Sequence, residues 1–286
     1  IIICNLSDTE MTSAIKTCND NGVYLAQFFR IISETNSADI YQAAKDSAYY
    51  IGAVHEDEPA NGEALVNILL DKGDRDIGLI GWEQGDATWL GRWEGYKAGV
   101  DKWNEAHPDD PAQLSEPQYA GTTSEGGSKA AEALMAADPN LDALIPAGGG
   151  GDPLQGAIAA VERAGKTQDI DIVSTDFLPD LGDRLENGSM AGESGGHYCD
   201  PLIEFMMVYN AIKGNYTGFA GNFEDVSFPY LYVSSAEDYQ AYEKYFVDQL
   251  PYTSDELVEM SNLDLSALKE AAKNISIEDA ASRAGN

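Results

Sequence analysis

The chain has 286 residues, of which 43% are hydrophobic, and it carries 17 Lys and Arg against 49 Asp and Glu, a formal net charge of -32 at pH 7. A field of that sign repels phosphate backbones and anionic membrane surfaces, so nucleic-acid binding is not expected. The sequence has no apolar run of about 18 residues, the length that indicates a membrane-spanning helix. The length leaves room for two domains of ordinary size.

Short apolar runs alternate with helical patterns along the first two-thirds of the chain. Strands are expected at 1–4, 23–29, 49–54, 77–82, 118–120, 141–147, 170–175 and 190–193. Helices are expected between them, at 8–21, 39–45, 59–73, 89–103, 124–135, 154–164 and 180–186. Further along, we expect a helix at 198–212, a strand at 226–233, a helix at 238–250 and short acidic helices from 253 on. This β–α alternation predicts parallel sheets covered by helices on both faces.

Open parallel sheets bind ligands at the carboxyl ends of their strands, so the residues just after each strand are the first candidates for a site. Arg30 ends the second predicted strand, where its guanidinium could hold hydroxyls or a carboxylate, or form a structural ion pair. Asp57 and Asp176 also follow strands. Their carboxylates could accept hydrogen bonds from vicinal sugar hydroxyls, or could cap the helices that follow.

Two tryptophans flank the loop after the strand at 77–82. Aromatic faces pack on the apolar C–H faces of pyranose rings, so Trp82 and Trp89 are candidates for sugar stacking. The alternative for both is packing in the core.

Four consecutive glycines, 148–151, follow another predicted strand and precede Asp152. They lack the G-x-G-x-x-G spacing of a dinucleotide site and the Lys-Ser/Thr of a P-loop. The run is therefore interpreted as a loop through which backbone amides approach a ligand. A Rossmann-like enzyme that uses the run for a nucleotide stays as an alternative.

Few residues suggest an enzyme. The chain has three histidines and no H-E-x-x-H, G-x-S-x-G or C-x-x-C motif. Residues 55–57, His-Glu-Asp, could ligate a metal, but three adjacent side chains seldom converge on one ion. His197 lies between a strand and an apolar helix, where a hinge could occur, although a lone histidine is usually structural. We therefore expect no catalysis, no cofactor and no metal.

Taken together, these elements resemble the type 1 periplasmic-binding-protein fold, the group that includes ribose-binding proteins and lac-repressor-like ligand domains. The resemblance covers about residues 1–234. Its motifs are the strand 22–30, with Phe29 in place of the family's acid, the Asp57-x-x-x-x-Gly62 segment, the strand 77–82 followed by Arg92-x-x-Gly95-Tyr96, the strand 169–176, and the segment 187–195.

The resemblance implies two doubly wound α/β lobes, joined by three hinge crossovers, that close on a small ligand. We expect the first lobe to comprise 1–74 and 197–225, the second 75–196 and 226–250, and a helical extension 251–286. Two β–α units of the family's first lobe have no counterpart here, so we expect a segment to precede residue 1. We expect the tail after residue 250 to be longer than usual.

By the same resemblance, Arg30 and Asp57 would bind ligand from the first lobe, and Arg92 and Asp176 from the second. Gly150 stands where the family has a usual sugar contact, with Asp152 close by. We add Gly150, Asp152 and His197 to the candidate ligand-binding residues.

The resemblance implies an extracytoplasmic solute-binding protein that delivers a carbohydrate or similar polyol to an ABC permease. It would be a monomer, attached to a membrane only through an N-terminal lipid anchor. The alternatives are the ligand-sensing domain of a lac-repressor-like transcriptional regulator and the input domain of a chemoreceptor.

Overall fold

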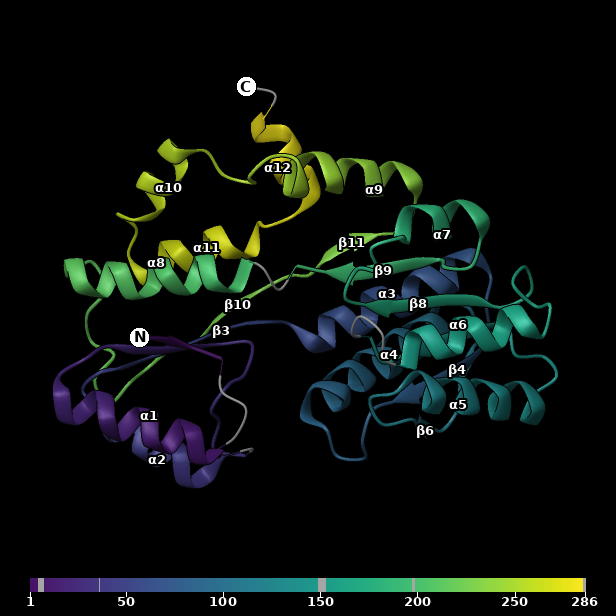
Figure 1. Ribbon diagram of the computed structural model, residues 1–286, viewed down its shortest axis with the longest axis horizontal. Helices are drawn as coiled ribbons and strands as arrows, with labels where there is room; N and C mark the ends of the chain where they lie inside the picture. The colour runs from purple at the N-terminus through teal and green to yellow at the C-terminus, as the bar shows by residue number, and fades with distance from the viewer. Residues whose placement is uncertain (5–7, 36, 149–152, 197–198, 285–286) are drawn as a thin grey trace. The chain divides into compact units, whose positions relative to one another are not determined.

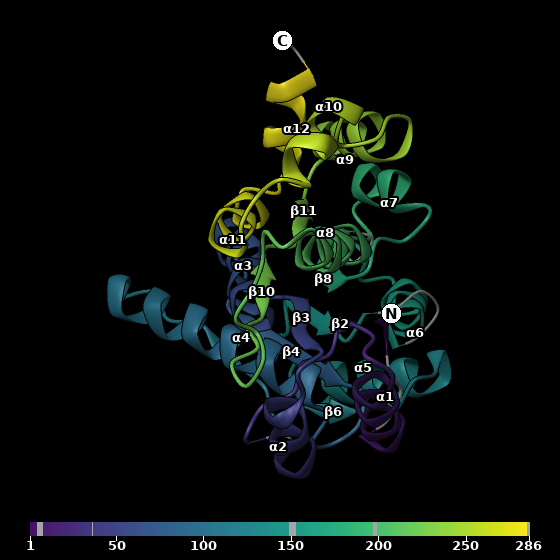
Figure 2. The ribbon, with the colours of Figure 1, turned by 90° about the vertical axis from the view of Figure 1, so that its left-hand side faces the viewer.

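The computed structural model describes residues 1–4, 8–35, 37–148, 153–196 and 199–284 (Figures 1 and 2). By its internal contacts the chain divides into two compact units. Unit 1 comprises residues 1–57, 196–230 and 249–286, and unit 2 comprises residues 58–195 and 231–248. The chain therefore passes from one unit to the other near residues 57, 195, 230 and 248.

Unit 1 is built on a parallel sheet of order β1-β2-β3-β10, whose strands are Ile2–Ile3, Leu25–Phe28, Tyr50–Glu56 and Val226–Phe228. Its helices are α1 (Asp8–Asn21), α2 (Ala38–Asp46), α8 (Asp200–Lys213), α10 (Ser254–Met260), α11 (Leu265–Lys273) and α12 (Ile277–Ala284). Helices α1 and α8 cover opposite faces of the sheet (Figure 1). Apolar side chains of α1, α2, β2 and β3 form a core on the α1 side of the sheet, among them Met11, Ile40, Leu25 and Tyr50.

Unit 2 is built on a sheet of order β11-β9-β8-β7-β4-β5, with β6 also paired to β4. The strands are β4 (Asp76–Gly81), β5 (Gln113–Leu114), β6 (Gln118–Tyr119), β7 (Ala143–Pro146), β8 (Asp171–Thr175), β9 (Gly192–Gly195) and β11 (Leu231–Val233). The helical segments are α3 (Glu58–Lys72), α4 (Ala87–Ala106), α5 (Ser124–Ala137), α6 (Pro153–Arg163), α7 (Leu181–Asn187), α9 (Ala236–Tyr242) and the π-helix η2 (Glu243–Val247). The core lies between the sheet and the α3–α4 pair.

Local sequence explains where the paired helices α3 and α4 begin and end. Helix α3 has proline at its second position, where no intrahelical N–H bond is lost, and Gly73 follows it with a φ of 110°. The Asp86 side chain caps α4 by accepting the Trp89 N–H at 2.8 Å.

Helix α3 lies in unit 2, whereas the sequence analysis placed residues 58–74 in the first lobe. The physical reason is a close helix crossing. A Cβ added at Gly62 would lie 2.1 Å from the carbonyl oxygen of Arg92, and one at Gly95 would lie 2.0 Å from that of Pro59. Two glycines at the contact let the backbones of α3 and α4 approach closely, so α3 packs on α4. Residues 251–286 were expected as a separate extension, and their contacts place them in unit 1.

The single strand expected at 226–233 is wrong. It divides into β10 and β11, which belong to different units. β10 runs parallel to β3, while β11 runs antiparallel to β9. Pro229 separates them, because proline has no N–H for a ladder and favours strand ends. The other expected elements occur, with shifts of a few residues, and the helix expected at 238–250 ends in η2. The segment expected before residue 1 stays a prediction.

Candidate functional site

The carboxyl edge of the unit 2 sheet gathers three of the predicted segments. Strands β4, β7 and β8 are parallel neighbours, with Ile80 opposite Pro146 and Ala143 opposite Asp171. Trp82 therefore follows β4 on the same edge where Asp176 follows β8. Two predicted ligand residues in the loop after β7, Gly150 and Asp152, lie outside the described residues, as does His197.

Asp176 has a backbone that is uncommon for its residue type. Its φ is 75°, in the left-handed region that costs a non-glycine residue free energy. The Asp176 N–H donates to the carbonyl oxygen of Ser194 at 2.7 Å, which holds this conformation against β9. Residues kept in such a conformation concentrate at functional sites, so this strain supports the selection of Asp176. The side chain is half-buried.

A buried polar network lies directly behind Asp176. The Thr175 hydroxyl is 3.1 Å from the Ser194 hydroxyl and accepts the Asn61 side-chain N–H at 3.1 Å. Asn61, Thr175 and Ser194 are each almost inaccessible to solvent. The network ties the first turn of α3 to β8 and β9, and so fixes the strand end from which Asp176 projects.

Trp89 and Arg92 lie inside unit 2. The Trp89 side chain is fully buried, 5.8 Å from the Tyr96 ring. The Arg92 side chain is 1% exposed, and its Nε donates to Oε2 of Glu58 at 2.6 Å. These positions favour the structural alternatives, core packing and a buried ion pair, over contact with a ligand. Trp82 is half-buried, with its ring 5.3 Å from the Arg92 guanidinium carbon. Among the described residues, the buried Trp82 Nε1 has no hydrogen-bond partner.

In unit 1, Arg30 and Asp57 are exposed beyond the carboxyl ends of the adjacent parallel strands β2 and β3. Phe29, next to Arg30, has a φ of 67°, and its N–H donates to the Val54 carbonyl at 2.8 Å. The Asp57 N–H donates to the Phe228 carbonyl at 3.2 Å. Among the described residues, each unit therefore has one non-glycine residue with positive φ directly after a strand, at or next to a predicted ligand residue.

The residues described give no sign of metal binding: no group of three His, Cys, Asp or Glu among them could hold an ion. Within residues 55–57, the His55 ring nitrogen Nδ1 lies 2.9 Å from the backbone oxygen of Glu56, and the Glu56 residue is buried whereas Asp57 is exposed.

Sequence reasoning missed two residues beside Asp176. Phe177 is half-buried and packs on Gly195 and Tyr242. Glu193 on β9 is fully buried, and its Oε2 accepts the Leu178 N–H at 2.7 Å. Burial raises the pKa of Glu193 to about 8, although the Leu178 N–H acts in the opposite direction. Glu193 could have been found in the sequence as an acidic residue within the predicted strand 190–193. Phe177 could have been found as the aromatic residue directly after Asp176.

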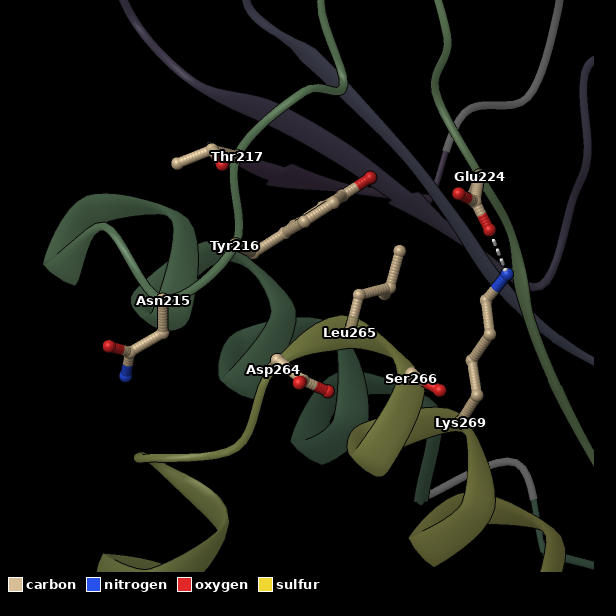
Figure 3. Close-up of a pocket in the computed structure, with 8 residues that line it drawn as sticks. All are labelled: Asn215, Tyr216, Thr217, Glu224, Asp264, Leu265, Ser266 and Lys269. Atoms are coloured by element: carbon tan, nitrogen blue, oxygen red, sulfur yellow. Dashed lines mark hydrogen bonds and ion pairs between the residues drawn. The ribbon is translucent and has the colours of Figure 1, made fainter.

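Unit 1 also contains a hollow of about 340 Å³, which Figure 3 shows. Its walls come from the α8–β10 connection and from α11, and include Asn215, Tyr216, Asp264 and Ser266. Lys269 in its wall donates to Glu224 at 2.6 Å. None of the predicted ligand residues lines this hollow, so we do not take it as the functional site.

Two α/β units with candidate residues after parallel strands are the arrangement expected of a protein that binds a small ligand. The sequence profile of the periplasmic binding protein domain matches residues 1–196. The chain belongs to this family, which is a family of extracytoplasmic binding proteins. A search of curated proteins finds no match. Within the described residues, no helix has both the length and the apolar character needed to cross a membrane.

Solved structures with the same fold include three sugar-bound proteins. One is a periplasmic solute-binding protein of an ABC transporter from Actinobacillus succinogenes with bound D-allose, at 14% identity and a TM-score of 0.67, covering 84% of this chain and 78% of that one. A second, from Agrobacterium vitis with α-D-tagatopyranose, has 17% identity and a TM-score of 0.64, covering 83% and 75%. The third, from the arabinose transporter of Shewanella sp. ANA-3 with L-arabinofuranose, has 18% identity and a TM-score of 0.63, covering 91% and 78%.

Proposed function

We propose that this chain is the solute-binding protein of an ABC importer and that it binds a sugar without transforming it. The family is one of binding proteins, and structures that share the fold carry tagatose, allose and arabinose. The single observation that carries the proposal within this chain is the strained backbone of Asp176 at the end of β8, held by the hydrogen bond to Ser194.

The chemistry of the strand ends suits a polyhydroxylated ligand. The carboxylate of Asp176 can accept hydrogen bonds from two neighbouring hydroxyls, and the half-buried ring of Trp82 can pack on a C–H face. Arg30 and Asp57 add a donor and an acceptor in unit 1. The ligand would stabilise the conformation in which it makes most of these contacts, as differential binding requires.

The experiment is a thermal-shift screen of the purified chain with pentoses, hexoses, disaccharides, nucleosides and amino acids at matched concentrations. A ligand at about 100 times its Kd stabilises the folded state by about 2.7 kcal/mol, which raises Tm by several degrees. We expect one or more sugars to give such a shift and the nucleosides and amino acids to give none. A shift with nucleosides alone, or no shift with any sugar, would refute sugar binding.

The remaining parts of the proposal concern partners and location. We infer that the chain acts outside the cytoplasm as a monomer, held by an N-terminal lipid anchor, and delivers its ligand to an ABC permease. The net charge of -32 argues against the alternative of a DNA-binding regulator. Stimulation of ATP hydrolysis by the cognate permease in liposomes, dependent on both the protein and the sugar, tests this part.

A further inference from the structure

Three aromatic side chains lie together in unit 2, beginning at the residue after Asp176. We call Phe177, Tyr242 and Phe246 the aromatic face. The ring centroids of Phe177 and Tyr242 are 4.6 Å apart with planes at 59°, and those of Tyr242 and Phe246 are 6.2 Å apart with planes at 18°. All three residues are half-buried, so each is partly accessible to solvent.

The position of Phe177 is fixed from both sides. The preceding residue, Asp176, donates its N–H to Ser194, and the following residue, Leu178, donates its N–H to the buried Glu193 carboxylate, both at 2.7 Å. The Phe177 ring lies over Gly195, where an added Cβ would approach it to 2.8 Å. The ring is thus preorganised beside the candidate ligand carboxylate.

The segment that carries Tyr242 and Phe246 does little for the core. Neither α9 nor η2 contains a buried residue, although Tyr239 of α9 packs over Gly182 of α7. The chain changes from α-helix to π-helix between the two rings, at residue 243. Single π-helical turns are rare and occur frequently at functional sites. A partly exposed ring on such a turn, Phe246, together with Tyr242 just before it and in line with Phe177, points to ligand contact more than to folding.

We propose that the aromatic face stacks on a second ring of the ligand, so that the chain takes a carbohydrate of at least two sugar units. The inference rests on the proposed sugar-binding function and narrows its ligand class. Asp176 would hold the hydroxyls of one unit. The next unit would place its C–H face on Tyr242 and Phe246, since aromatic rings pack on such faces without requiring a particular hydroxyl pattern.

Isothermal titration calorimetry tests this with glucose, galactose and arabinose against cellobiose, maltose, lactose and an arabinobiose. We expect at least one disaccharide to bind about tenfold more tightly than its constituent monosaccharides, because a stacked ring adds free energy of that order. Phe246→Ala should remove this advantage and leave monosaccharide affinity within about twofold, while Phe246→Tyr should retain it.

Tyr245→Ala serves as the matched control, because Tyr245 lies on the same π-helix but contacts Lys244 and is not part of the aromatic face. Its Tm and that of Phe246→Ala report folding. If monosaccharides bind as tightly as disaccharides, or Phe246→Ala binds both like the wild type, the second-ring contact is refuted and sugar binding stands. If no saccharide binds, the proposed function and this inference both fail.

Discussion

Arg92 on α4 and Glu58 on α3 form an ion pair inside unit 2, with Nε donating to Oε2 at 2.6 Å and side chains only 1% and 18% exposed. The pair lies beside the close crossing of Gly62 and Gly95, so charge pairing and backbone contact hold the same two helices together. Arg92, the arginine of the Arg92-x-x-Gly95-Tyr96 motif, is therefore buried where α3 and α4 pack together.

Glu58→Ala should destabilise unit 2 by about 3 kcal/mol, because it removes the carboxylate that accepts a hydrogen bond from the buried Arg92 guanidinium. Denaturant unfolding of the variant measures this. Glu132→Ala is the control: Glu132 pairs with Arg163, but both side chains are 56% exposed. Exposed pairs contribute at most about 1 kcal/mol. Equal losses in the two variants would contradict a structural role for the Arg92 pair.

Glu193 predicts a pH dependence of stability. Its pKa is raised by burial from about 4.5 in the unfolded chain to about 8, so the folded state retains a proton that the unfolded state loses between these values. The stability linked to Glu193 is therefore fully present below pH 4.5 and is lost as pH rises through 8. Glu193→Gln keeps an oxygen for the Leu178 N–H and cannot ionise. Its Tm should match the wild type at pH 5 and exceed it at pH 9, and a pH-independent difference would contradict this.

Salt should stabilise the whole chain. A net charge of -32 makes the compact state repel itself, and raising the ionic strength from 0.1 to 1 M shortens the screening length from about 10 to about 3 Å. We expect Tm to rise by several degrees as NaCl increases over this range. Sorbitol at the same osmolality controls for effects not caused by charge. A constant or falling Tm in NaCl would show that repulsion between the negative charges does not lower the stability of the folded state significantly.

Much of the fold follows from the sequence, because buried strands and amphipathic helices leave clear apolar periods. Nearly all the expected elements occur, including the short acidic helices after residue 253. The unit boundary at residue 57 does not follow, because it depends on which neighbour α3 packs against, and glycines at one helix crossing decide that. Pro229 indicates the break after β10, but the apolar residues on both sides of it favour a single strand.

The candidate site is less predictable. Position after a strand makes Asp176 a candidate, and its positive φ is visible only in the structure. The sequence does not distinguish a tryptophan in the core from one at a strand end. Trp89 and Trp82 are therefore equal candidates for sugar stacking in the sequence, although only Trp82 is partly exposed in the structure. The aromatic face brings Phe177 into contact with side chains of α9 and η2. Because these segments are far apart in the sequence, no local pattern predicts the contact.

The most direct test of the account is the calorimetric affinity of Asp176→Ala for the tightest-binding sugar, measured beside Asp169→Ala, which changes an exposed acid just before the amino end of the same strand. We predict that Asp176→Ala weakens binding by about 1–3 kcal/mol, the cost of leaving a bound hydroxyl without its partner. Asp169→Ala should bind like the wild type. Unchanged affinity in a folded Asp176→Ala protein would contradict the assignment of the sugar site to this strand end.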